Sequence, residues 1–102
     1  GFIGTLAIEQ IHNYRFDLSF SGTVGMNIHD GKVTTYDVED GLTKKEVMDA
    51  SKKCYLVAEN EKLNLDGNYV FGHLSEFTGY IGEQELGSPF KEKIMEYGLE
   101  II

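Results

Sequence analysis

A glycine-containing loop is the first stretch of this sequence with the residue types to bind an anion. Gly22, Thr23 and Gly25 follow an alternating strand pattern, so the loop can present backbone N–H groups to a negatively charged ligand. The same spacing also suits a plain glycine turn. On the residues alone, the glycine turn is the favoured interpretation.

A lysine later in the chain is a second candidate for the same chemistry. Lys62 comes shortly after the apolar run Cys54–Ala58, and ligands of open α/β sheets collect outside the carboxyl ends of strands, where an ammonium group can meet a phosphate. Lys62 can equally pair with Glu59 or Glu61 at the surface, and the spacing leaves both interpretations open. Thr34–Thr35 is either a strand end or a source of hydroxyl groups for a ligand.

Other site chemistries find little support in the sequence. His12, His29 and His73 are scattered and are accompanied by one cysteine, Cys54, which does not match the close ligand spacing of a zinc site. The acidic run Asp37–Asp40 does not place oxygen ligands at all the positions that an EF-hand requires. It suits a helix start, where negative charge is favoured. No nucleophile–base set is recognisable. We expect no metal and no cofactor.

Helix and strand patterns alternate along the first half of the chain. A helix is expected to begin at Thr5, and Phe16–Phe20 alternates at the strand period of two before ending at Gly22. The continuous apolar run Cys54–Ala58 predicts a central strand that is buried on both faces.

The helix between these two strands has three possible starts: a cap by Asp37, a cap by Asp40, or a capping box made by Thr43 and Glu46. Its expected apolar arc is Leu42, Val47 and Ala50, and its expected outward residues are Lys44, Lys45 and Lys52.

The rest of the chain carries shorter signals. Residues 22–35 are loop-rich, with one extended piece at Lys32–Thr35. The later expected elements are a turn at 66–68, strands at Tyr69–Phe71, Phe77–Ile81 and Leu99–Ile102, and a helix from Ser88 to Gly98. The alternation predicts an α/β fold with a partial parallel or mixed sheet and helices on both faces.

Length and charge narrow the classes of protein. The chain has 102 residues and begins with Gly1, which indicates one domain or a piece of one. Its net charge of -8 disfavours direct binding to a phosphate backbone. No apolar run reaches the length of a membrane span and no signal segment opens the chain, so we expect no membrane partner. A single cysteine fits a reducing, cytoplasmic location.

The run from Phe16 to Phe77 resembles the effector-binding domain of the DeoR family of bacterial transcriptional repressors. The segments that carry the resemblance are FDLSFSGTVGM, TTYDVEDGLTKKEVMDASKKCYLVAENEKLN and VFGHLSEF. The resemblance implies a fold like that of ribose phosphate isomerase and a phosphorylated sugar as inducer. It also implies a homo-oligomer and a DNA-binding winged helix-turn-helix that lies outside residues 1–102. Residues 1–102 themselves would form the second half of the effector domain.

Carried over position by position, the resemblance implies one set of effector-binding residues: Gly22, Thr23, Gly25, Thr34, Thr35, Lys44, Glu59 and Lys62. Three positions depart from the family pattern. Val24 stands where Asn is frequent, Tyr36 replaces Pro, and Glu59 replaces Asp. These departures leave phosphate binding in place and bear on which sugar is bound.

The same resemblance argues against catalysis. Lys44 falls where the isomerase has its glutamate base, and a protonated lysine cannot accept a proton as a carboxylate does. We therefore expect the effector-sensing part of a transcriptional repressor rather than an enzyme. Two alternatives stay open at this point: an isomerase-like enzyme, and an oligomerisation module that shares an exposed sheet edge.

Overall fold

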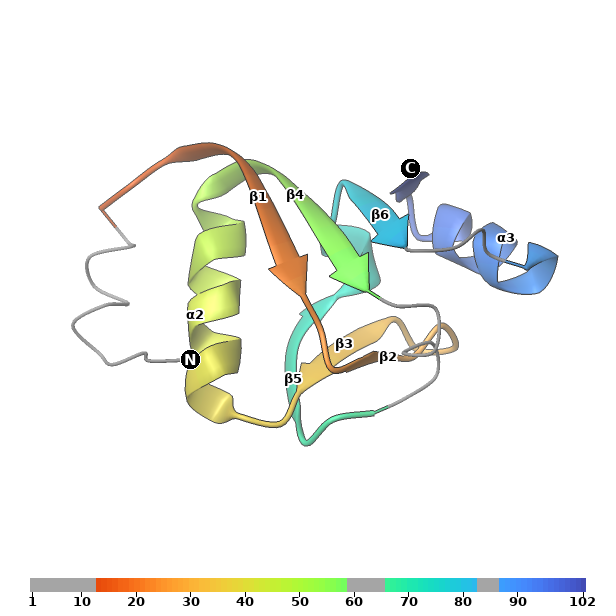
Figure 1. Ribbon diagram of the computed structural model, residues 1–102, viewed down its shortest axis with the longest axis horizontal. Coiled ribbons are helices and arrows are strands. Elements are labelled where there is room, and N and C mark those ends of the chain that lie inside the picture. The colour runs from red at the N-terminus through yellow and green to blue at the C-terminus, as the bar shows by residue number, and fades with distance from the viewer. Residues whose placement is uncertain (1–12, 59–65, 83–86) are drawn as a thin grey trace.

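The computed structural model describes residues 13–58, 66–82 and 87–102 (Figure 1). Their main sheet has four strands in the order β1-β4-β6-β7, and every neighbouring pair is parallel. The strands are β1 (Phe16–Gly22), β4 (Ser51–Ala58), β6 (Gly79–Gly82) and β7 (Glu100–Ile101). The predicted α/β class with a parallel sheet is confirmed.

One helix, α2 (Val38–Asp49), lies along β1 and β4 (Figure 1). Its N-cap is Asp37, whose Oδ1 accepts a hydrogen bond of 3.0 Å from the backbone N–H of Glu39. This cap selects one of the three predicted starts and places Thr43 inside the helix. Asp40 lies in the first turn, where a carboxylate is favoured by the helix dipole.

The predicted apolar arc of this helix is partly wrong. Leu42 is 39% exposed, whereas Gly41 and Met48 are buried. Asp40, Lys44 and Met48 are separated by about one turn each and share the face of the helix that is turned inward. Lys44 is therefore not an outward residue.

Three strands form a second, antiparallel sheet in the order β2-β3-β5: β2 (Gly25–Met26), β3 (Lys32–Thr35) and β5 (Tyr69–His73). The sequence predicted extended segments for β3 and β5 but not their pairing, and it assigned β2 to a loop. A two-residue strand is too short to show an alternating pattern. The turn before β3 uses Gly31, whose φ of 79° favours glycine.

The hydrophobic core lies between the two sheets and the helices. Residues of the 3-10 helix η2 (Leu74–Glu76) and of α3 (Ser88–Glu96) also contribute to it; α3 begins at Ser88, as predicted, and is followed by Gly98 at a φ of 95°. The buried core residues are Met26, Ile28, Val33, Met48, Cys54, Leu56, Phe71, Leu74, Phe77, Tyr80, Ile94 and Leu99. None of the helices in the described part of the chain is long and apolar enough to span a bilayer.

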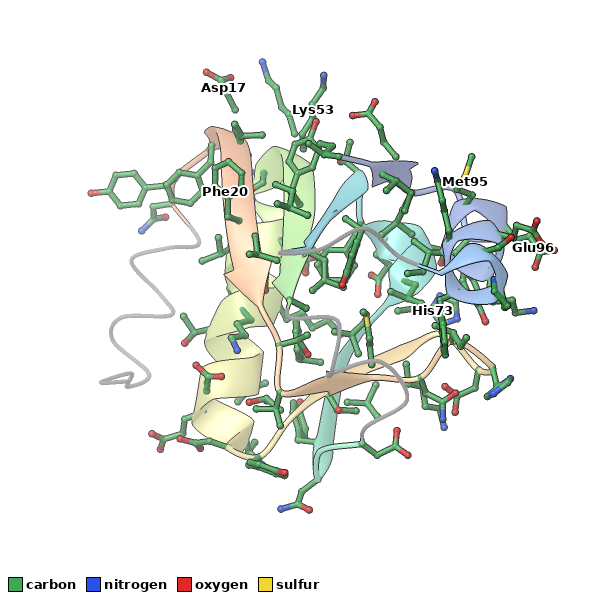
Figure 2. All side chains as sticks on the ribbon, turned by 45° about the vertical axis from the view of Figure 1, so that its right-hand side comes forward. Asp17, Phe20, Lys53, His73, Met95 and Glu96 are labelled. Carbon is green, nitrogen blue, oxygen red and sulfur yellow. The ribbon has the colours of Figure 1, made fainter. Side chains whose placement is uncertain are left out.

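The two faces of the main sheet differ. Cys54 and Leu56 on β4 point into the core and are 4% and 0% exposed, but the neighbouring Val57 is 39% exposed. On β1, Phe20 is 60% exposed and projects from the sheet (Figure 2). The prediction that β4 is buried on both faces is therefore wrong for the described residues. The helix expected from Thr5 lies within residues 1–12, outside the described residues.

Candidate functional site

A small cavity of about 130 Å³ lies between α2 and the carboxyl-terminal half of β1. Its lining residues come from β1, α2 and β4: Phe20, Ser21, Gly22, Thr43, Lys44, Val47 and Cys54. Gly22 pairs with Val57 in the parallel register, so β1 and β4 end side by side near this cavity. It lies where ligands of open α/β sheets collect, and two of the predicted site residues, Gly22 and Lys44, line it.

The Lys44 ammonium is held by two groups of the protein. Its Nζ lies 2.9 Å from Oδ2 of Asp40, one helical turn earlier, and 5.4 Å from the centre of the Phe71 ring. Its side chain is only 23% exposed. The next residue, Lys45, is exposed. The two lysines therefore have different environments although the sequence placed both on the outer face.

Asp40 connects this lysine to the small antiparallel sheet. The same Oδ2 atom accepts a hydrogen bond of 3.0 Å from Oγ1 of Thr35 on β3. Burial raises the pKa of Asp40, but the hydrogen bonds from Lys44 and Thr35 and the charge of Lys44 outweigh burial and lower the pKa overall. Sequence reasoning missed Asp40 as a site residue; the four-residue spacing from Lys44 was the available signal.

The two predicted threonines act within the framework. Oγ1 of Thr34 accepts a hydrogen bond of 2.6 Å from the N–H of Gly67 and donates one of 3.2 Å to the carbonyl of Gly25. Thr35 donates to Asp40, and both threonines are 3% exposed. The structure therefore uses these hydroxyls to join strands, turn and helix, and Thr34–Thr35 forms the end of strand β3.

The glycine loop is a tight connection from β1 to β2. The hydroxyl of Thr23 lies 2.8 Å from the carbonyl oxygens of both Gly25 and Thr34 and donates to either. The N–H of Val24 donates to the Thr34 carbonyl at 3.2 Å. This amide is therefore not available to an anion, and the loop is closer to the glycine turn than to an open cradle. At Gly22, however, an added Cβ would meet no atom within 4 Å, so space is open there.

Thr43 is a cavity residue that the sequence did not single out. Its Oγ1 is buried and has no hydrogen-bond partner among the described residues. A buried hydroxyl without a partner is unfavourable unless something else completes it. Local sequence pattern did not mark Thr43, because the face of α2 that turns inward is decided by packing against the strands.

Two predicted residues lie outside this description. Glu59 and Lys62 fall within residues 59–65, which the structure does not describe. Their role remains a prediction from the sequence.

The thiol in the cavity wall is unreactive in character. Burial raises the pKa of Cys54, which keeps the thiol protonated and poorly nucleophilic at neutral pH. Within the described ranges, no group of three or more His, Cys, Asp and Glu side chains is arranged to hold a metal ion.

Comparison with known proteins identifies the family. Residues 1–84 match the family described as the DeoR C terminal sensor domain. The chain belongs to this family. The resemblance carried by the sequence motifs is thereby confirmed, and the DeoR sensor domain is a domain of transcription regulators rather than an enzyme.

The similar proteins are regulators of transcription. The chain is 25% identical over 99 residues to the HTH-type transcriptional repressor GlcR of Bacillus subtilis (strain 168), which covers 97% of this chain and 38% of GlcR. It is 26% identical over 100 residues to the HTH-type transcriptional regulator GlpR of Haloferax volcanii, which covers 98% of this chain and 39% of GlpR. It is 32% identical over 80 residues to the uncharacterized HTH-type transcriptional regulator FruR of Bacillus subtilis (strain 168), with 78% and 28% covered. The chain thus spans about two fifths or less of these relatives.

Proposed function

We propose that this DeoR sensor domain binds a phosphorylated sugar, and that binding shifts the full-length protein between a DNA-binding and a released state. The observation that carries the proposal is the meeting of Lys44, Thr43 and Gly22 at one cavity beside the ends of β1 and β4. The Lys44 ammonium and the Thr43 hydroxyl, which is unpaired in the part of the chain that the structure describes, are donors for phosphate oxygens, and Gly22 leaves room for them.

The size of the cavity supports a phosphate group as the part that enters it. About 130 Å³ is below the roughly 300 Å³ at which pockets for whole small molecules begin. The sugar would then lie outside the cavity mouth. Glu59 and Lys62, which the family resemblance implicates, are proposed as further contacts.

The remaining predicted residues would position the site rather than contact the ligand. Thr23, Gly25, Thr34 and Thr35 are proposed to fix the loop and β3 relative to α2, through the hydrogen bonds between them. Their loss would disturb the position of Asp40 and Lys44 rather than remove a ligand contact.

The mechanism is linkage without a covalent step. A sugar phosphate that binds one state of the regulator better than the other shifts the equilibrium toward that state. In this proposal, DNA is bound by a segment of the full-length cytoplasmic protein outside residues 1–102, as in the HTH-type relatives, and the regulator acts as a homo-oligomer on genes of sugar metabolism.

Thermal unfolding of the full-length protein tests the proposal. Phosphorylated hexoses and pentoses should raise the melting temperature, and the corresponding neutral sugars should not, because a ligand that binds the native state stabilises it. Lys44→Ala should weaken the effect at least tenfold in ligand concentration. Lys45→Ala is the matched control, because it removes the same charge from the exposed side of the same helix and should leave the effect intact.

Two results would contradict the proposal. If no phosphorylated sugar shifts the melting temperature of the wild-type protein, the effector claim fails. If Lys44→Ala and Lys45→Ala respond alike, the cavity beside Lys44 is not where the phosphate binds. Consumption of a sugar phosphate during the assay would instead favour an isomerase-like enzyme.

A further inference from the structure

The Lys44 ammonium is already paired before any ligand arrives. Oδ2 of Asp40 is 2.9 Å from it, and the pair is mostly shielded from solvent, with 23% and 26% of the two side chains exposed. The lowered pKa of Asp40, to which Lys44 and Thr35 contribute against the opposing effect of burial, keeps that carboxylate ionised at neutral pH. An incoming anion therefore meets a pair of opposite charges and not a free cation.

We propose that Asp40 determines the selectivity of this site by competing with the ligand for Lys44, so that a dianionic phosphate displaces Asp40 from the ammonium more readily than a carboxylate or a neutral sugar does. This inference rests on the proposed function and adds its discriminating residue. A monoanionic carboxylate would only exchange one carboxylate for another at Lys44. A phosphate brings two negative charges and three oxygens, and it can also use the Thr43 hydroxyl, which has no partner within the described ranges.

The competition for Lys44 also connects the site to the small antiparallel sheet. Asp40 is bound by a second group, the hydroxyl of Thr35 on β3, at 3.0 Å on the same oxygen. When Lys44 leaves, Asp40 keeps this hydrogen bond and loses its neutralising charge. Ligand binding at α2 would then change the electrostatic surroundings of Thr35 on β3, the central strand of the small sheet.

Asp40→Asn in the full-length protein separates charge from hydrogen bonding, because the amide oxygen still accepts from Thr35 while the negative charge is gone. The probes are inorganic phosphate, acetate and the phosphorylated sugar that gives the largest shift in the thermal panel, titrated at pH 8. We expect phosphate and the sugar phosphate to bind about three- to tenfold more tightly to Asp40→Asn. Acetate should gain more than phosphate, so that the preference for phosphate over acetate falls at least threefold.

Glu39→Gln is the matched control. It changes the net charge of the same helical turn by the same amount, and Glu39 is exposed. It should change neither the affinity nor the preference by more than about twofold, because screened charges at the surface interact weakly. If Glu39→Gln reproduces the effect of Asp40→Asn, the effect is one of overall charge and the inference is wrong.

The remaining outcomes separate this inference from the proposed function. Weaker phosphate binding by a folded Asp40→Asn, with normal binding by the wild type, would mean that Asp40 positions Lys44, and it would overturn the inference alone. Failure of the wild type to bind any phosphorylated probe would overturn both. If Asp40→Asn does not fold, carboxyl ¹³C NMR of the wild type decides: the Asp40 pKa should rise when phosphate is added, and an unchanged pKa would refute the competition.

Discussion

The two faces of β4 differ in burial, as two adjacent residues on opposite faces show. Leu56 points toward α2 and the core and is fully buried, whereas Val57 points to the opposite face and is 39% exposed. On that opposite face, Leu18 and Phe20 of β1 are 47% and 60% exposed. The face toward α2 therefore carries both the core and the candidate site, and the other face contributes much less to the stability of the described fold.

Substitutions at these two neighbours should show the largest difference. Leu56→Ala is expected to lower the free energy of unfolding by about 2–5 kcal/mol, because it removes a buried side chain and leaves a cavity. Val57→Ala should cost below about 1 kcal/mol, since much of that side chain is already in water. Chemical denaturation of both variants measures the difference. Equal losses would mean that the outer face of β4 is covered in solution.

Removing the N-cap of α2, the helix that covers the buried face, should cause a loss of stability of intermediate size. Asp37→Ala should cost about 1 kcal/mol, because the N–H of Glu39 loses the side-chain acceptor that lies 3.0 Å away. Asp49→Ala at the other end of the helix is the control, and it should be neutral or slightly stabilising because a carboxylate there opposes the helix dipole. Similar losses for the two variants would show that the cap does not anchor α2.

The sequence predicted the elements of the main sheet better than their surroundings. Phe16–Phe20 alternates in polarity, and Cys54–Ala58 is an apolar run, so both strands were detectable from local pattern. The same apolar run led to the wrong prediction of burial on both faces. Strand burial depends on which elements cover each face, and that is decided by packing far away in the chain.

The candidate site was predictable only in part. Gly22 and Lys44 entered through family resemblance, and the structure places both at one cavity. Asp40 and Thr43 were missed because the apolar arc predicted for α2, namely Leu42, Val47 and Ala50, did not identify the face of the helix that packs inward. Three possible starts were compatible with the sequence, but residues one turn apart share a face whichever start is used, and packing against the strands decides which face turns inward.

The smallest expected difference between the two faces concerns ionisation. Burial raises the pKa of the Cys54 thiol above its ordinary value of 9.0. The contribution to stability is therefore complete below pH 9 and is lost as the pH rises, because the unfolded thiol ionises first. Relative to Cys54→Val, the wild type should lose stability between pH 8 and pH 9.5, by less than about 0.8 kcal/mol, which is the limit reached if the folded thiol does not ionise at all. A cysteine placed on the open face by Val57→Cys in the Cys54→Val background should show no such loss, and denaturation at the two pH values compares the three proteins. A loss of the same size in both cysteine-containing proteins would mean that the two faces do not differ in their exclusion of water.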